Sequence, residues 1–315
     1  MIESAIEVQS LTKRYGDLVA VDQLSFQVRK GTVFGFLGPN GAGKTTTLKM
    51  LACLIRPDNG TALVAGHNIA TEPMAVRRSI GYVSEAQGFY ERMTAAETLD
   101  YLGCLLDLPG PQRRQRAADL LSQVGLADRR DSYVGTFSKG MKQRLALAQA
   151  LLAEPAVLLL DEPTLGLDPM GAKEIRDRIL TLKQDRTVTI FLSSHMLSEV
   201  EAICDEVGII DHGRMLAQDS VANLRRTTDN GMEFEIVLAQ PNEAVVAALQ
   251  ETSSVQDVKV VDGRRLMICT TGKDEVRPQI VETVVRNGGQ MLSLCAKGSS
   301  LEEILLQAVG NGRER

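Results

Sequence analysis

One run of eight residues constrains this chain more than any other: Gly38-Pro39-Asn40-Gly41-Ala42-Gly43-Lys44-Thr45. It follows the apolar residues 32–37, which predict a buried strand, and precedes residues 46–52, which predict a helix. This is the G-x-x-x-x-G-K-[ST] pattern in the strand–loop–helix setting that it requires. The glycines allow a tight curl that points successive N–H groups at a phosphate chain, and the helix adds its positive dipole end. The run predicts a nucleoside triphosphate site in which Lys44 reaches the outer phosphates, the Thr45 hydroxyl holds Mg²⁺ and Thr46 opens the helix.

The composition of the chain restricts the kinds of partner on which a nucleotide site here can act. The chain has 315 residues, a formal net charge of −5, 4% aromatic residues and no Trp. This length suggests about two domains. Few aromatic rings and a negative charge argue against a surface that stacks bases or binds a phosphate backbone, so no nucleic-acid partner is expected. The five scattered cysteines lack a C-x-x-C pair, which is typical of reduced thiols in a cytosolic protein, and the three histidines lack metal-ligand spacing.

No part of the sequence has the pattern of a secretory signal or a membrane span. The N-terminal residues lack the basic and apolar regions of a signal peptide. The most apolar stretch, residues 145–160, is interrupted by Gln149, Glu154 and Pro155, and falls short of the roughly twenty apolar residues that cross a bilayer. The sequence therefore predicts a soluble, cytoplasmic polypeptide.

The order of predicted elements indicates an α/β fold. Residues 5–30 have the alternation of antiparallel strands, and residues from about 90 to 152 are mainly helical. Two apolar runs, 156–160 and 188–192, are typical of strands buried on both faces of a parallel sheet, and a helix near 169–184 joins them. We predict a P-loop domain with a mixed core sheet, an antiparallel β subdomain and a helical subdomain.

A second, smaller domain is predicted at the C-terminal end. A polar stretch around 225–231 marks the linker, so the first domain covers 1–228 and the second 229–315. The second domain reads as strand, helix, strand, strand, helix, strand, with a hairpin turn at Asp262-Gly263 and a final helix at 300–309. This βαββαβ order is the ferredoxin-like α+β arrangement, and it carries no chemical motif.

Two carboxylates follow the first apolar run. Asp161 and Glu162 come where that strand ends, and ligands of open α/β sheets bind at the carboxyl ends of strands. Asp161 is therefore placed to hold Mg²⁺, usually through water, and Glu162 to approach the outer phosphate as a base or a water-orienting group. An isolated Asp-Glu pair is often only a solvated loop, but the P-loop upstream favours the site.

A second motif precedes these carboxylates at the start of a predicted helix: Phe137-Ser138-Lys139-Gly140-Met141-Lys142-Gln143-Arg144. It resembles the L-S-G-G-Q signature of the ATP-binding subunits of ABC (ATP-binding cassette) transporters, and the resemblance extends over about residues 5–220. Ser138 caps the helix and Gly140 permits close backbone approach. In that family this helix end meets the γ-phosphate held by the other subunit. The resemblance thus implies a homodimer that binds two Mg-ATP and drives separate polytopic membrane subunits.

Other positions follow the family's order of motifs. Tyr15 stands where the family has an aromatic ring on adenine, although a surface strand aromatic is the alternative. Asp168 ends a Thr-Leu-Gly-Leu-Asp run that resembles the D-loop, and it is also placed to cap the next helix; both roles are compatible. His195 resembles the switch histidine that contacts γ-phosphate and positions water. His67 and His212 fall in predicted turns and are assigned no site role.

Two departures from the family pattern bear on mechanism. Glu85 takes the place of the family's usual Gln, with Gln87 two residues later as the alternative. A carboxylate at this place can ligate Mg²⁺ but repels γ-phosphate. In the signature, Lys139 replaces the commonest Gly and either adds positive charge near the partner's phosphate or faces solvent. With the extra C-terminal domain, these variants resemble the ABC-2 branch, whose members serve mostly exporters.

The expected function is that of an ATP-hydrolysing subunit of an ABC exporter, peripheral on the cytoplasmic face of the membrane. The membrane partner is expected near Phe89, Tyr90 and Tyr101, with a core role for these rings as the alternative. Other hypotheses are an ABC ATPase acting on ribosomes or DNA, which usually has a second cassette or a coiled-coil insertion, and a non-hydrolysing regulator, which Glu85 leaves open. The C-terminal domain is a sensor, a dimerisation surface or, as we prefer, a brace between two copies.

Overall fold

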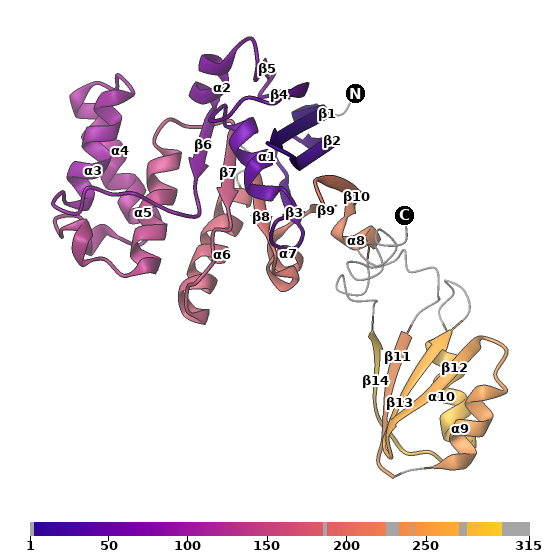
Figure 1. The fold of residues 1–315 in the computed structure, drawn as a ribbon. Coiled ribbons are helices and arrows are strands. Elements are labelled where there is room, and N and C mark those ends of the chain that lie inside the picture. The colour runs from indigo at the N-terminus through magenta and orange to yellow at the C-terminus, as the bar shows by residue number, and fades with distance from the viewer. Residues whose placement is uncertain (1–2, 185–187, 225–232, 241, 271–275, 298–315) are drawn as a thin grey trace. The chain divides into compact units, whose positions relative to one another are not determined.

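The computed structural model divides the chain into two compact units, Met1–Val221 and Ala222–Arg315 (Figure 1). The structure describes residues 3–184, 188–224, 233–240, 242–270 and 276–297. The predicted domain boundary after residue 228 and the predicted final helix at 300–309 lie outside these described residues.

The first unit is built on a six-stranded mixed sheet in the order β10-β9-β3-β8-β7-β6. Its strands are β3 Val33–Leu37, β6 Ile80–Val83, β7 Val157–Asp161, β8 Thr189–Ser194, β9 Glu206–Asp211 and β10 Arg214–Ser220. Five strands are parallel, and β10 joins β9 as an antiparallel hairpin. Every residue of β3, β7, β8 and β9 is buried, which explains why their sequences are nearly continuous apolar runs.

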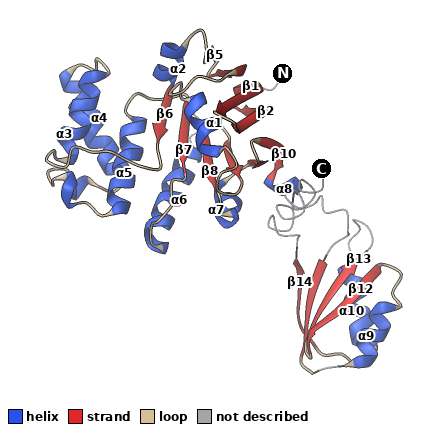
Figure 2. Ribbon diagram, viewed as in Figure 1, coloured by secondary structure: helices blue, strands red, loops and turns tan. Residues whose placement is uncertain are grey.

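A four-stranded antiparallel sheet in the order β2-β1-β4-β5 packs against the mixed sheet (Figure 2). Its strands are β1 Ser4–Tyr15, β2 Leu18–Arg29, β4 Asn59–Val64 and β5 His67–Asn68. The alternation predicted for residues 5–30 is confirmed, because β1 and β2 form a hairpin in which Tyr15 faces Leu18.

Helices surround the sheets of the first unit: α1 Lys44–Leu51, α2 Pro73–Ser79, α3 Ala95–Leu105, α4 Gly110–Gln123, α5 Lys139–Leu151, α6 Pro169–Gln184 and α7 Leu197–Ile203. The short helix α8 Val221–Leu224 begins at the boundary between the two units. Figure 2 shows α3, α4 and α5 gathered to one side of the sheets, as the helical subdomain. The side chain of Thr94 accepts from the Glu97 amide and Glu97 accepts from the Thr94 amide, a reciprocal cap that fixes where α3 begins.

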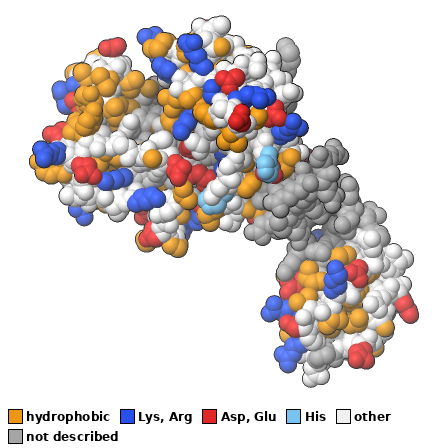
Figure 3. Space-filling model, viewed as in Figure 1, with side chains coloured by type: hydrophobic (Ala, Val, Ile, Leu, Met, Phe, Trp, Pro, Cys, Tyr) orange, Lys and Arg blue, Asp and Glu red, His pale blue; other side chains and the backbone are white. Residues whose placement is uncertain are grey.

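Hydrophobic side chains are exposed on the helical subdomain (Figure 3). Tyr90 and Tyr101 meet edge to face with ring centroids 6.0 Å apart, and both are exposed, as are Leu105 and Leu106. Phe89 is half-buried. The alternative of a core role is therefore wrong for Tyr90 and Tyr101, whose rings form an apolar surface instead.

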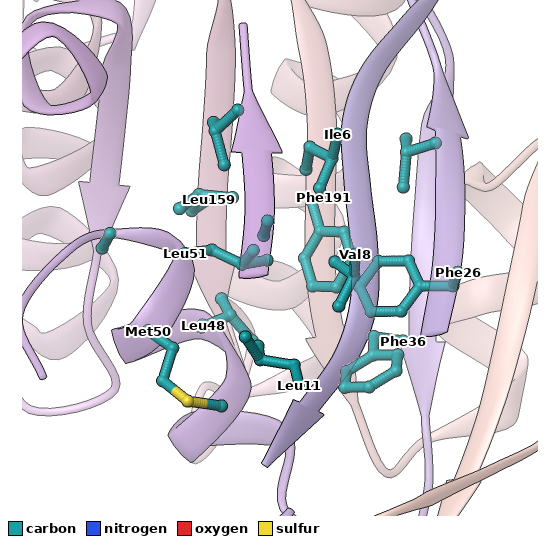
Figure 4. Packing of buried hydrophobic residues seen from close by; sticks show 14 of the residues in the cluster. Ile6, Val8, Leu11, Phe26, Phe36, Leu48, Met50, Leu51, Leu159 and Phe191 are labelled. Carbon is teal, nitrogen blue, oxygen red and sulfur yellow. The ribbon is translucent and has the colours of Figure 1, made fainter. Parts of the chain in front are cut away.

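The core of the first unit lies between its two sheets (Figure 4). Phe26 of β2 packs 5.6 Å from Phe36 of β3 and 5.8 Å from Phe191 of β8, measured between ring centroids. Leu48 and Leu51 of α1 complete this cluster. Because α1 begins at the P-loop, the same core that joins the sheets also holds the loop in place.

The second unit is a four-stranded antiparallel sheet in the order β12-β13-β11-β14. Its elements are β11 Glu233–Leu238, α9 Glu243–Gln250, β12 Val255–Asp262, β13 Arg265–Thr270, α10 Arg277–Arg286 and β14 Met291–Lys297. This confirms the ferredoxin-like prediction. The hairpin prediction is shifted by one residue: Asp262 pairs with Arg265, so the two loop residues are Gly263 and Arg264. Asp262 instead accepts the amides of Arg264 and Arg265.

Within the described residues, every helix is too short or too polar to span a lipid bilayer. All five cysteines are free thiols.

Candidate functional site

The P-loop curls between β3 and α1 in direct contact with neighbouring strands. An added Cβ at Gly43, where φ is +102°, would collide with the Ala20 carbonyl oxygen, and one at Gly38 with the Ile210 carbonyl oxygen. The Gly213 amide donates to the Ala42 carbonyl at 3.0 Å. The loop is therefore clamped by the backbone of β2 and the β9–β10 turn, at positions where only glycine fits.

The start of α1 is suited to an anion. Gly43 is its N-cap and offers no side-chain hydrogen bond, and the first turn holds no acidic residue. The amides of this turn and the positive end of the helix dipole are thus left for a ligand.

Lys44 lies inside the loop, with its side chain only 6% exposed. Its ammonium donates to the carbonyl oxygens of Gly38 at 2.7 Å and Pro39 at 3.1 Å. It also lies 3.3 Å from Oε1 of Glu162. A buried cation is thus stabilised beside the loop and can exchange these partners for phosphate oxygens.

The Asp161 side chain links the P-loop to β8 through hydrogen bonds. Its Oδ1 accepts hydrogen bonds from Thr45 Oγ1 at 3.0 Å and Ser193 Oγ at 2.8 Å. Its Oδ2 is buried and has no hydrogen-bond partner in the described part of the chain. Burial raises the pKa of Asp161, although the bonds from Ser193 and Thr45 act in the opposite direction. An unpartnered carboxylate oxygen next to a threonine hydroxyl fits a hard cation such as Mg²⁺.

Glu162 bridges Lys44 and His195. Its Oε2 lies 2.8 Å from Nδ1 of His195, and its amide donates to Ser193 Oγ at 3.0 Å. The Glu162 side chain is only 9% exposed, and its backbone has φ of +48°, in the left-handed region that residues other than glycine rarely adopt. The carboxylate is thus held between a cation and an imidazole at the carboxyl end of β7.

Lys44, Glu162 and His195 line one cleft of about 600 Å³. Its lining includes predicted site residues from the P-loop and from four other segments: Tyr15, Asn40, Gly41, Gly43, Lys44, Thr45, Thr46, Glu85, Glu162 and His195. Glu85 faces the cleft, whereas Gln87 is outside the lining and hydrogen-bonds Gln143. The other predicted site residues outside the lining are Gly38, Pro39, Ala42, Ser138, Gly140, Asp161 and Asp168.

The cleft also contains residues that the sequence did not reveal. His212 lines it, together with Leu18, Val19 and Ala20, and Leu165 from the run that resembles the D-loop lines it as well. The prediction of a bare turn for His212 is therefore incomplete. Its signal was its place after a β-strand, but only the pairing of β9 with β3 brings that strand end to the P-loop.

The signature motif forms the start of α5. Ser138 Oγ accepts from the Met141 amide at 3.2 Å, which confirms its capping position. An added Cβ at Gly166, where φ is +69°, would collide with the Lys139 ammonium, so this exposed lysine lies against the D-loop of its own chain. Asp168 Oδ1 accepts the Gly171 amide at 2.9 Å, as expected of a helix cap.

Comparison with known proteins agrees with this architecture. Residues 21–165 match the family described as ABC transporter. The bacitracin transport ATP-binding protein of Bacillus licheniformis is 38% identical over 312 residues, covering 99% of each chain. A daunorubicin resistance ATP-binding protein of Streptomyces coeruleorubidus is 36% identical over 315 residues, covering 99% of this chain and 98% of that one.

Solved structures show the same cassette. The structure of an ATP binding subunit of an ABC transporter is similar with a TM-score of 0.64 and 33% identity, over 71% of this chain and 92% of that chain. Family match, full-length relatives and cassette fold agree, so the chain belongs to the ABC transporter family, as one of its ATP-binding subunits.

Proposed function

We propose that this chain hydrolyses ATP to drive an ABC-2-type exporter, as a homodimer bound to polytopic membrane subunits on the cytoplasmic face of the membrane. The observation that carries the proposal is the placement of Glu162 between Lys44 and His195, next to Asp161 and Thr45. The relatives named for bacitracin transport and daunorubicin resistance support export of a toxic compound.

The cleft would bind the adenine of ATP at one end and its phosphates at the other. At one end, Tyr15 is 48% exposed and offers a ring face to adenine. At the other, the Lys44 ammonium and the backbone amides of the cleft-lining residues from Gly43 to Thr46 hold the phosphates. Gly38, Pro39 and Ala42 shape the loop instead, because the Gly38 and Ala42 amides donate to the Ser194 and Pro39 carbonyls and proline has no amide hydrogen. Mg²⁺ would be held by Thr45, by Asp161 through water and by Glu85, and when bound it neutralises charge on the phosphate oxygens.

Hydrolysis then follows from the two groups beside the outer phosphate. Glu162 accepts a proton from a water molecule whose oxygen forms the new bond to the γ-phosphorus. The bond from that phosphorus to the bridging oxygen breaks, and ADP leaves with the bonding electrons. His195 orients Glu162 and the water, because its Nδ1 already contacts the carboxylate. The low exposure of the Glu162 side chain strengthens these electrostatic contacts.

A second copy would complete each site. Ser138 and Gly140 begin a helix whose amides suit a γ-phosphate, yet they lie outside the cleft of their own chain. Two copies facing each other would place α5 of one against the ATP of the other, with Asp168 of each D-loop near the junction. We assign this role to residues 1–228 and a bracing role between copies to residues 229–315.

The test is co-purification from membranes followed by a phosphate-release assay. We expect the chain to co-purify with a polytopic membrane protein and to release phosphate from Mg-ATP. Co-sedimentation with ribosomes or DNA would instead favour a non-transport ATPase. ATP binding without phosphate release, with or without the membrane partner, would favour a regulator.

A further inference from the structure

Tyr15 lines the cleft with an exposed side chain. Tyr15 ends β1, and the next residue, Gly16, turns the chain with φ of +58°. The ring is 48% exposed. An exposed side chain at a strand end has several rotamers open to it, and stacking on a base requires one of them. Something must therefore fix the orientation of the ring.

One cation lies over that ring. Lys13 Nζ is 5.6 Å from the centroid of the Tyr15 ring. A cation within about 6 Å of an aromatic centroid is attracted to the electron-rich face. The Lys13 side chain is only 16% exposed, although it is a lysine on the outer sheet. Its ammonium thus occupies one face of the ring and leaves the other face available.

Asp58 holds Lys13 in that position. Its Oδ1 lies 3.0 Å from Lys13 Nζ, and its Oδ2 accepts the Arg14 amide at 2.6 Å. The Asp58 amide donates to the Thr12 carbonyl at 2.8 Å. The Arg14 amide, and then the Lys13 ammonium, lower the pKa of Asp58, so its carboxylate stays charged. A loop residue before β4 therefore fixes both the backbone and the side chain that support Tyr15.

We propose that Lys13 is a positioning residue for nucleotide binding: held by Asp58, its ammonium orients the Tyr15 ring so that the free face meets adenine. The inference rests on the proposed stacking of Tyr15 on adenine. Lys13 lies outside the lining of the cleft, so its effect passes through the ring rather than through contact with phosphate. Removing the Lys13 charge should therefore weaken the binding of a ligand that carries a base and leave the binding of a ligand without a base unchanged.

The experiment compares ATP with inorganic tripolyphosphate, which lacks the base, by measuring Kd on the full chain. Lys13→Met keeps the length and removes the charge, and it should raise Kd for ATP about two- to fivefold, the value of one exposed cation–π contact. Lys13→Arg keeps a cation and should bind ATP like the parent. Kd for tripolyphosphate should be the same in all three proteins.

Two further variants separate the possible failures. In a Tyr15→Ala background, which itself should bind ATP more weakly, Lys13→Met should add no further loss. If Tyr15→Ala weakens ATP binding but Lys13→Met does not, the role of Lys13 is overturned and adenine stacking stands. If Tyr15→Ala has no effect, both are overturned. Equal losses for ATP and tripolyphosphate would also overturn the role of Lys13.

Asp58→Asn keeps an acceptor for the Arg14 amide and removes the charge that holds Lys13. It should weaken ATP binding in the same direction as Lys13→Met, which supplies the test if Lys13→Met does not fold. An unchanged Kd for ATP in Asp58→Asn would contradict the anchoring role of Asp58.

Discussion

Nδ1 of His195 lies 2.8 Å from Oε2 of Glu162, while the other oxygen of the same carboxylate lies 3.3 Å from the Lys44 ammonium. Each oxygen of Glu162 thus has one positively polarised neighbour. A carboxylate held in this way is aimed before the substrate arrives, which is what a base or a water-orienting group requires.

Glu162→Gln should lower the rate of ATP hydrolysis by about 10²- to 10⁴-fold, the usual contribution of a general base. Binding of ATP should persist, because glutamine has the same size and its carbonyl can still accept from Lys44. Phosphate release and ATP affinity measured on the same preparation check both parts. Turnover at the parent rate would show that another group takes the proton.

Glu85→Gln should bind ATP more tightly than the parent when Mg²⁺ is absent. Glu85 faces the cleft, and like charges about 4 Å apart in water repel by about 1 kcal/mol, roughly fivefold in Kd. With Mg²⁺ present the difference should shrink, because the carboxylate then has a cation to bind. Gln87→Ala, changed outside the cleft, is the matched control. Tighter binding by Gln87→Ala alone would assign the position to Gln87.

Tyr82→Phe should raise the stability of the cassette by about 1 kcal/mol at neutral pH. The Tyr82 hydroxyl is buried without a hydrogen-bond partner among the described residues, and such a group destabilises a fold. Thermal unfolding of both proteins at pH 8 measures the difference. A lower midpoint for the variant would mean that the hydroxyl has a partner.

The same pair of proteins tests a dependence on pH. Burial, with smaller effects from Asp161 and Glu85, raises the pKa of Tyr82 from its ordinary 10 to about 12. The folded state therefore favours the neutral phenol, whereas the phenol of the unfolded chain ionises near pH 10. The free energy of unfolding of the parent should thus be unaffected by this group below pH 10 and should fall as pH rises from 10 towards 12. The advantage of Tyr82→Phe should grow between pH 8 and pH 11. A constant difference would contradict the raised pKa.

Tyr90→Glu should separate ATP hydrolysis from transport while leaving Kd for ATP unchanged. The ring is 64% exposed and belongs to the apolar surface of the helical subdomain, so a charge there should weaken docking of the membrane subunit. Stimulation of ATPase activity by that subunit is the readout. Met74→Glu introduces the same charge at an exposed apolar residue of α2. Equal effects of the two variants would argue against a specific docking surface.

The local chemistry was predictable because it depends on neighbours in the chain. The P-loop, the Asp161-Glu162 pair at the carboxyl end of β7 and the cap at Ser138 each fall within a few residues, and all lie on the elements that the sequence predicted. The helices α2 and α7 were not predicted. Each has seven residues, which is too short to show helical periodicity.

Relationships between distant strands could not be read from the sequence. The pairing of β9 with β3 brings His212 to the cleft, and the β1–β2 hairpin brings Leu18 to Ala20 there. Strand order is decided by packing of whole sheets, not by any local run of residues. The contact of Lys139 with Gly166 has the same origin, since it joins the first residue of α5 to a loop 27 positions later, and the two meet only in the folded chain.

At position 162, the glutamate that the proposed hydrolysis requires is not the residue that best suits the left-handed backbone. A residue with a side chain in this region carries strain of about 1–3 kcal/mol, which Gly or Asn largely relieves. In a mutant library selected only for survival at high temperature, Gly and Asn should become enriched at position 162. Under the proposed function, such a population would keep its fold and lose ATP hydrolysis, so heat selection and activity selection would favour different residues at this one position.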